Sequence, residues 1–319
     1  MEDLRTTQAP GFRLHPFRSL LILLGFVLIG MSVGGLLAMV ALLGWTTAQG
    51  EDAVLNMAEI MTSPELFAGG WYALMLVQAV SHVFTFLVPS LLFWRLLEGR
   101  RWRDFQARPL AAVPSLALVA LLTVSFMPFN GLIIDWNQGI ELPALLESLE
   151  QWMKDKEAQL GKLTTFLTTF SSPLQLLVAL GVIAVLPAIG EEVLFRGIVQ
   201  RKLTEWTASV HAGIWLAAVV FSAIHVQFYG FVPRVLLGAL FGYLYVWSRN
   251  LWVPILAHFV NNGFTVLMVW LHRQKLVSVD IENTRSVPLA GAFFSLLLTI
   301  GFLYYFRKRN LSARSQPHG

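Results

Sequence analysis

The sequence alternates long apolar segments with short polar ones. Eight apolar segments each approach the roughly 20 residues that a tilted helix needs to cross the hydrocarbon of a bilayer. Their approximate positions are 20–45, 70–95, 109–134, 173–198, 209–228, 231–247, 251–271 and 287–306. The pattern predicts an all-α fold, a polytopic bundle of about eight transmembrane helices.

The first of these segments is predicted to remain in the mature protein. Residues 1–18 carry three arginines and two prolines, with no small-residue cleavage site before the apolar run. The run at 20–45 is longer than the apolar core of a signal peptide, so we interpret it as a retained transmembrane helix.

The charges between the segments predict the orientation. The loop at 46–69 carries four acidic residues and no Lys or Arg, whereas the loop at 95–108 carries five arginines. The chain after residue 306 adds three more arginines and a lysine. Lys and Arg are enriched on the cytoplasmic side, and eight crossings return the chain to the side on which it starts. Both termini are therefore predicted to be cytoplasmic.

The composition excludes several classes of protein. Hydrophobic residues make up 56% of the chain and charged residues only 13%, whereas a soluble domain carries about 25% charged residues. A soluble enzyme, a disordered chain and a nucleic-acid-binding domain are excluded, and the net charge of +4 resides mostly in loops and tails. Because there is no cysteine, disulfides, thiolate catalysis and Cys-based zinc sites are excluded as well.

Two glutamates stand out inside the fourth apolar segment. A charge within a span costs at least ~2.5–3.5 kcal/mol on insertion scales and is a functional candidate by default. Of the thirteen glutamates, only Glu191 and Glu192 lie inside a span. One alternative is that the helix ends at Gly190 and the pair lies at the surface. The basic residues Arg201 and Lys202 come later, however, which places Glu191 roughly 15 Å below that edge, near mid-bilayer.

A third charged residue follows one turn later. Arg196 lies on the same helix face as Glu192, and this spacing predicts an ion pair that keeps Glu192 charged. Glu191 lies about 100° around the helix and has no obvious basic neighbour. It is therefore the carboxylate that can take a proton from water. Arg234, near the start of its apolar segment, is interpreted as a side chain that reaches out to the membrane surface.

Two histidines supply the remaining chemistry. His225 lies one turn after Phe221, and His258 lies one turn before Asn262. Polar groups one turn apart on apolar helices predict a site that faces the bundle interior. His82 also lies inside a span, but its polar companions are few, and we interpret it as a packing residue.

These residue types are suited to hydrolysis. A glutamate aided by a histidine or a metal ion can activate water, while another histidine and an amide donate hydrogen bonds to the oxyanion. Glu191, His225 and His258 could instead ligate Zn²⁺ with one position left open for water. The residues leave a metal-free mechanism and a zinc mechanism equally open.

The expected boundaries conflict with a shared site in one respect. Entering from the cytoplasmic side, His225 comes about 16 residues into its segment and His258 only about 8. His225 should then lie deeper than Glu191. A common site requires tilted or offset helices, or a fifth segment that begins later than residue 209.

Three motifs in order, EExxxR at 191–196, FxxxH at 221–225 and HxxxN at 258–262, resemble the CPBP intramembrane protease family. This family includes type II CAAX prenyl endopeptidases, lysostaphin-resistance proteins, and proteins of bacteriocin processing or self-immunity. The resemblance covers about 175–265. Three ordered motifs in separate apolar segments are a specific signal, whereas EExxxR alone is weak.

The resemblance implies a role for each motif residue. Glu191 corresponds to the catalytic glutamate, and His225 to the histidine that positions or binds the nucleophilic water. His258 and Asn262 correspond to the pair that stabilises the oxyanion or, in the metalloprotease description, binds a metal. Glu192 and Arg196 correspond to a supporting ion pair.

The predicted organisation has three parts. Residues 1–172 hold the first three spans and, at 135–172, a polar stretch expected to form an amphipathic helix on the outer side. Residues 173–271 form the CPBP-like catalytic core, and residues 272–319 hold the last span and a basic cytoplasmic tail.

The leading hypothesis is an intramembrane metalloendopeptidase or metal-free endopeptidase that hydrolyses membrane-associated proteins or peptides. The expected partners are that substrate and the lipid bilayer, with no nucleic acid, and the expected location is a bacterial plasma membrane. One alternative is a proton-coupled transporter, in which Glu191, Glu192 and the histidines relay protons. Another is a non-catalytic bacteriocin self-immunity protein.

Overall fold

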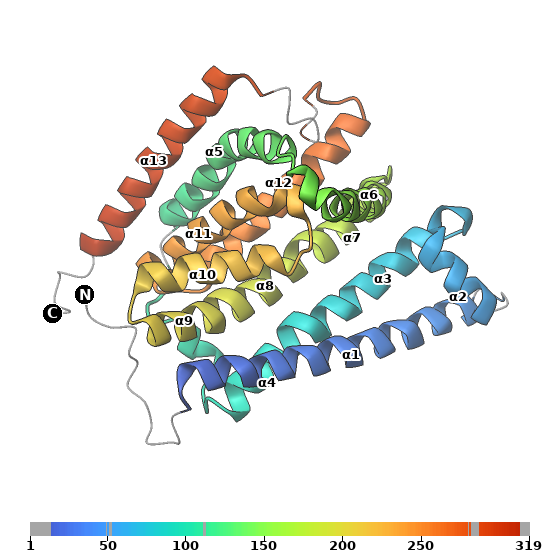
Figure 1. Ribbon diagram of the computed structural model, residues 1–319, viewed down its shortest axis with the longest axis horizontal. Helices are drawn as coiled ribbons and strands as arrows, with labels where there is room; N and C mark the ends of the chain where they lie inside the picture. The colour runs from blue at the N-terminus through green and yellow to red at the C-terminus, as the bar shows by residue number, and fades with distance from the viewer. Residues whose placement is uncertain are drawn as a thin grey trace.

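The chain folds into a bundle of α-helices (Figure 1). The computed structural model describes residues 14–48, 50, 53–110, 113–279, 281 and 287–312. Among these residues no strand forms, and Gln106 and Asn250 make an isolated antiparallel bridge. The predicted all-α fold is confirmed.

Helices long enough to cross a membrane are α1 (Pro16–Ala48), α3–α4 (Gly70–His82 and Val88–Leu96), α5 (Val113–Gln138), α7–α9 (Pro173–Ala179, Leu186–Glu192 and Gln200–Thr207), α11 (Phe231–Ser248), α12 (Trp252–Arg273) and α13 (Leu289–Ser312). Short π-helical segments keep the compound helices continuous, at Val83–Leu87, Leu180–Val185 and Val193–Val199. The shorter helices are α2 (Ala53–Thr62), α6 (Glu147–Thr168) and α10 (Val210–Ala223).

Seven of the described helices are long and apolar enough to cross a membrane, which makes this an integral membrane protein, with one long helix fewer than predicted. The segment expected at 209–228 forms only α10, whose 14 residues extend roughly 21 Å, less than the ~30 Å hydrocarbon. The chain leaves the helix near Ile224, and Val226 takes a positive φ of 52°. Apolar composition continues through this turn, so hydropathy alone does not detect the helix end.

The start of α1 and the end of α13 nevertheless lie at the same end of the bundle (Figure 1). There Glu98 accepts hydrogen bonds from Ser19 Oγ at 3.3 Å and Lys202 Nζ at 2.9 Å. Nearby in the same loop, Arg108 Nη1 donates to the Asn310 carbonyl at 3.1 Å. The N-terminal helix, the arginine-rich loop and the C-terminal helix thus share one end, as the charge pattern requires. Their assignment to the cytoplasm stays a prediction.

The fourth span is longer than predicted, and the arginine-rich loop gives a reference for the depth of Glu192 and His258. It continues through α9 to Thr207 instead of ending at 198. Arg201 Nη1 donates to the Asp104 carbonyl at 3.2 Å, and Asn250 bridges to Gln106 in the same loop. Glu192 is nine residues from Arg201 and His258 is eight residues from Asn250. Glu192 and His258 therefore lie at a similar depth, measured from the loop that contacts both Arg201 and Asn250.

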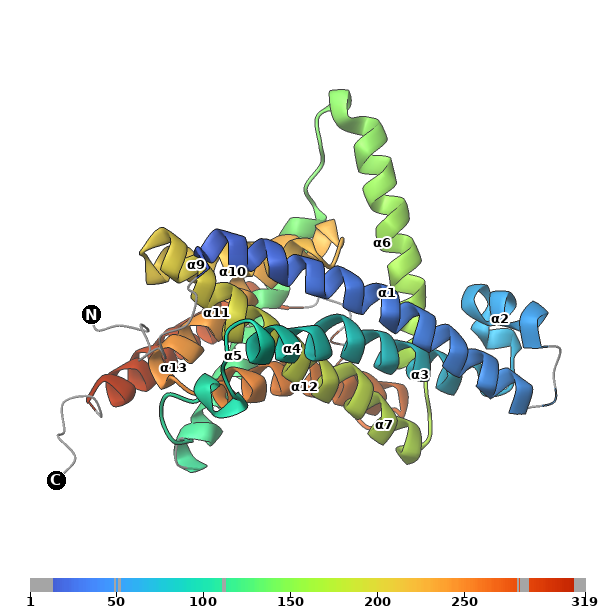
Figure 2. The same ribbon diagram turned by 90° about the horizontal axis from the view of Figure 1, so that it is seen from below.

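Helix α6 lies across the bundle instead of along it. Figure 2 shows it projecting away from the other helices, while its C-terminal end is tied to α3 by a 3.0 Å hydrogen bond from Trp71 Nε1 to the Leu167 carbonyl. The helix predicted within 135–172 is confirmed. The side of the membrane on which it lies stays a prediction.

Candidate active site

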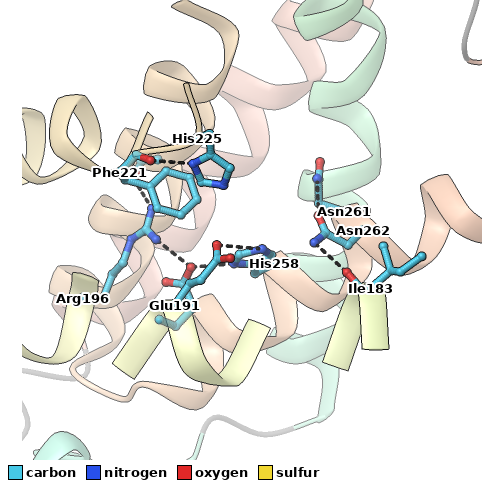
Figure 3. Close-up of polar contacts among 10 residues, drawn as sticks. Ile183, Glu191, Arg196, Phe221, His225, His258, Asn261 and Asn262 are labelled. Carbon is cyan, nitrogen blue, oxygen red and sulfur yellow. Dashed lines mark hydrogen bonds and ion pairs between the residues drawn. The ribbon is translucent and has the colours of Figure 1, made fainter. Parts of the chain in front are cut away.

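The candidate site is built around the fully buried carboxylate of Glu192, at the end of α8. Figure 3 shows Glu191, Arg196 and His258 gathered at this site. Its Oε1 accepts two hydrogen bonds, from Arg196 Nη1 at 2.7 Å and from His258 Nδ1 at 2.8 Å. The ion pair that the i,i+4 spacing predicts is therefore present. The same oxygen joins the fourth span to α12.

The guanidinium of Arg196 is held on several sides at once. Its Nη2 donates to the Gly238 carbonyl on α11 at 2.8 Å, and its Cζ lies 4.8 Å from the Phe221 ring and 5.4 Å from the Phe241 ring. Hydrogen bonds and aromatic faces together compensate a buried arginine. A Cβ on Gly238 would meet Ala218 at 3.1 Å, so the glycine permits α11 to approach α10 closely here.

His258 lies between the two glutamates. Phe241 stacks on its ring with centroids 5.4 Å apart, and Phe221 meets it edge-on at 6.2 Å. Because Nδ1 donates to Glu192, Nε2 is the nitrogen left facing Glu191, whose Oε2 lies 3.9 Å away. That distance is too long for a direct hydrogen bond. Glu191 itself is 7% exposed.

His225 lies just beyond the end of α10 and is half-buried. Its Nδ1 lies 2.7 Å from the Phe221 carbonyl. A carbonyl can only accept, so Nδ1 carries the hydrogen and Nε2 presents a lone pair. The Phe221 ring contacts His225 at 5.0 Å and His258 at 6.2 Å between centroids. Phe221 thus connects the two histidines, which do not touch each other directly.

Asn262 lies one turn beyond His258 and bonds back to the fourth span. Its Nδ2 donates to the Ile183 carbonyl at 3.1 Å, and its Oδ1 accepts from Asn261 Nδ2 at 3.0 Å. In a regular α-helix the N–H of residue 187 would donate to the Ile183 carbonyl, but residue 187 is a proline and has no N–H. The amide of Asn262 supplies a donor to this carbonyl.

The backbone around the two glutamates is not a regular α-helix. A π-helical segment, Val193–Val199, begins directly after Glu192, and all of its residues are buried. Single π-helical turns inside α-helices occur frequently at functional sites. The widened turn contains Arg196, the partner of Glu192.

The described residues do not form a ready metal site. Among them, no group of three or more His, Cys, Asp or Glu side chains lies close enough to hold a metal ion. Glu191 and His258 Nε2 face each other, but His225 does not complete a set of three ligands with them. The residues as placed do not fit a zinc ion, so the chemistry below is derived from the side chains alone. Zinc binding stays a prediction.

Two residues near the site were not included by the sequence argument. His82 packs against Gly190, where a Cβ would meet His82 Nε2 at 3.0 Å, so this histidine lies directly behind the glutamate pair. It also lines a cavity of about 370 Å³ between α3 and α6, together with Gln78 and Leu163. Hydropathy could not reveal this contact, which depends on how α3 packs on α8.

Arg234 is the second such residue, and its expected snorkelling to the membrane surface is wrong. Helix α11 begins where the short α10 has ended, inside the bundle, and Arg234 is partly buried with Nη1 fully inaccessible. The signal in the sequence was the charge itself, because an arginine in an apolar span is a functional candidate.

Comparison with known proteins supports the family resemblance. Residues 173–264 match the family model described as "Type II CAAX prenyl endopeptidase Rce1-like". The matched segment contains all three motifs, so the resemblance that they predicted is confirmed for it. No solved structure matches the chain.

Two curated relatives from Bacillus subtilis (strain 168) are similar over a shorter length. The "Uncharacterized protein YpbD" is 34% identical over 82 residues, covering 24% of this chain and 39% of that protein. The "Putative membrane peptidase YdiL" is 32% identical over 96 residues, covering 30% of this chain and 37% of that protein. The similarity therefore spans less than two fifths of either relative.

Proposed function

We propose that this chain, whose residues 173–264 belong to the Rce1-like family of membrane proteases, is itself an intramembrane endopeptidase. The observation that carries the proposal is the buried convergence of Glu191, His258 and the Glu192–Arg196 pair. The substrate would be a membrane-associated protein or peptide. The expected bacterial plasma membrane location belongs to the same proposal.

In this proposal Glu191 is the general base. Its carboxylate accepts a proton from a water molecule whose oxygen attacks the scissile carbonyl, and the resulting C–O bond gives a tetrahedral oxyanion. When the C–N bond breaks, Glu191 returns that proton to the leaving amine. His225 would orient the water, because its Nε2 lone pair can accept a hydrogen bond from it.

The oxyanion requires hydrogen-bond donors. His258 can donate from Nε2 when that nitrogen carries a proton, while Glu192 holds the ring through Nδ1. Asn262 would donate from Nδ2 after its hydrogen bond to the Ile183 carbonyl breaks, or would keep that bond and fix the position of α12. Arg196 holds the Glu192 carboxylate in place.

Hydrolysis of a membrane-peptide library by purified protein in detergent tests this function. Wild type is compared with Glu191→Gln, which retains the shape of the side chain but cannot act as a base. Glu65→Gln, at an exposed position of the short 3-10 helix Pro64–Leu66, is the matched control. We expect Glu191→Gln to lose hydrolysis by about 10²-fold or more and Glu65→Gln to cleave like wild type. Equal cleavage by all three would identify a contaminant and contradict the proposal.

A chelator arm tests the zinc prediction in the same assay. Activity that survives prolonged chelation supports water activation by Glu191 alone. Activity that is lost on chelation and restored by Zn²⁺ would support a metal ion bound by Glu191 and the two histidines, and would require them to move closer together than they lie here.

A further inference from the structure

Arg234 is a cation in the first turn of α11, one turn before Gly238, whose carbonyl accepts a hydrogen bond from Arg196. Nη2 donates to Gln227 Oε1 at 2.5 Å. Nη1 is buried, and no described residue lies within hydrogen-bonding distance of it. Gly230 makes room for the group, since a Cβ there would meet Nη2 at 3.2 Å. The guanidinium is thus fixed by a neutral amide, with one nitrogen left unsatisfied.

Two carboxylates act on this charge from a distance, without forming an ion pair with it among the described residues. They are Glu157 on α6 and Glu191. Glu157 faces the backbone N–H groups of Phe228 and Tyr229 instead. Arg234 in turn acts electrostatically on His225. Its hydrogen-bond acceptor Gln227 lies two residues after His225, which places Arg234 in the surroundings of the site without an ion pair of its own in the described part of the chain.

An unpaired guanidinium inside a bundle is costly, because its hydration is lost without compensation. Such a group is favourable when an anion binds to it, and the planar fork of arginine matches a carboxylate with two parallel hydrogen bonds. The unsatisfied Nη1 provides half of such a fork once a substrate reaches it, and Gln227, which holds the same guanidinium, lies only two residues after His225.

We propose that Arg234, positioned by Gln227, binds a carboxylate of the peptide substrate and so places a nearby peptide bond against Glu191. This inference rests on the proposed endopeptidase function. The carboxylate has two possible sources, the C-terminus of the substrate or an acidic side chain next to the scissile bond. Either source makes the enzyme selective for anionic peptides.

Matched peptides test the selectivity without altering the protein. One cleaved peptide is prepared with a free C-terminus and with a C-terminal amide, and separately with Asp or Asn near the cut. The carboxylate form of one pair should be cleaved with a kcat/KM roughly 10- to 100-fold higher, the value of one charge-assisted hydrogen-bonded pair. The pair that responds identifies the source. No preference in either pair overturns the proposal.

Variants then assign the preference to the arginine. Arg234→Gln should remove it, mainly through a higher KM for the carboxylate form of the peptide. Arg234→Lys keeps the charge but not the fork, and should retain only part of the preference. Glu157→Gln is the control for a general change in charge, and should leave the preference intact. A preference that persists in Arg234→Gln contradicts the assignment.

Binding separates failure of this inference from failure of the proposed function. Fluorescence anisotropy of the labelled peptides is measured with Glu191→Gln protein, in which hydrolysis is not required. Tighter binding of the carboxylate form, lost on adding Arg234→Gln, supports the anion site even if wild type cleaves nothing. Hydrolysis by wild type together with equal binding of both forms would retain the protease and reject the role of Arg234.

Discussion

Glu192 and His258 are joined by a 2.8 Å hydrogen bond although 66 residues separate them in the chain. The same Glu192 oxygen also accepts from Arg196 at 2.7 Å. One atom therefore balances a buried cation and orients the imidazole that faces Glu191. Because both roles depend on one oxygen, a substitution of Glu192 removes both. A second substitution, at Arg196, then separates the balance of charge from the orientation of His258.

Replacing Glu192 by leucine should destabilise the protein strongly. Arg196 would remain buried without its counter-charge, which costs about 3–5 kcal/mol in comparable buried pairs. In the double variant Glu192→Leu with Arg196→Met, both charges are absent, and the thermal midpoint in detergent should recover much of the loss. Hydrolysis should not recover, because His258 still lacks its acceptor. A double variant less stable than Glu192→Leu alone would contradict this account.

The bond from Asn262 to the Ile183 carbonyl can be tested by restoring the missing donor. In Pro187→Ala the backbone N–H of residue 187 becomes available to that carbonyl. Asn262→Ala should cost about 1–2 kcal/mol in the natural sequence and clearly less in the Pro187→Ala background, as a double-mutant cycle of thermal stability would show.

The same cycle separates structure from catalysis. If Asn262 also stabilises the oxyanion, Pro187→Ala restores the stability of Asn262→Ala but not its kcat. Full recovery of kcat together with stability would assign Asn262 a purely structural role.

Two glutamates on or near α6 should respond to pH in opposite directions. Burial raises the pKa of Glu157 above its ordinary value of 4.5, so its ionisation disfavours the folded state as pH rises. Glu157→Gln should raise the thermal midpoint at pH 7, and the difference should vanish below pH 4.5. The measurement is a melting series in detergent from pH 4 to 8.

Glu150 is the control for this series. Its pKa is lowered by the hydrogen bonds from Lys154 Nζ and the Leu142 N–H. A lowered pKa contributes stability above 4.5 that is lost as pH falls. Glu150→Gln should therefore lower the midpoint at pH 7, with a difference that shrinks at pH 4. The same sign for both variants would contradict the two environments described.

The orientation of the bundle can be measured directly because the chain has no cysteine. Ala107→Cys lies in the exposed arginine-rich loop, and Ser278→Cys lies exposed beyond the opposite end of α12. In intact cells an impermeant maleimide should label Ser278→Cys and not Ala107→Cys. After permeabilisation both should react. The reverse pattern in intact cells would place the termini outside.

The apolar pattern was sufficient to predict most of the fold. Seven of the eight expected segments form long helices at close to the predicted positions, because the length of an apolar run relative to the bilayer determines whether it can span it. The spacing of Glu192 and Arg196 predicted their ion pair, since a four-residue separation always places two side chains on one helix face.

The errors arose where the helix ended for reasons other than polarity. Segment 209–228 is apolar throughout, yet α10 ends at Ala223 and the chain turns at Val226. Arg234 follows in the first turn of α11, where it is partly buried and donates to Gln227. The sequence could not show this, because the depth of a side chain depends on where its neighbours begin and end.

The sequence by itself determined the class of protein, its long helices and the residue types available for hydrolysis, because these follow from local composition and spacing. Only the tertiary structure decided which polar groups meet. The contacts of Glu192 with His258 and of Asn262 with Ile183 both depend on the tilt and close approach of separate helices. Those contacts form between segments distant in the chain, and no local spacing encodes them.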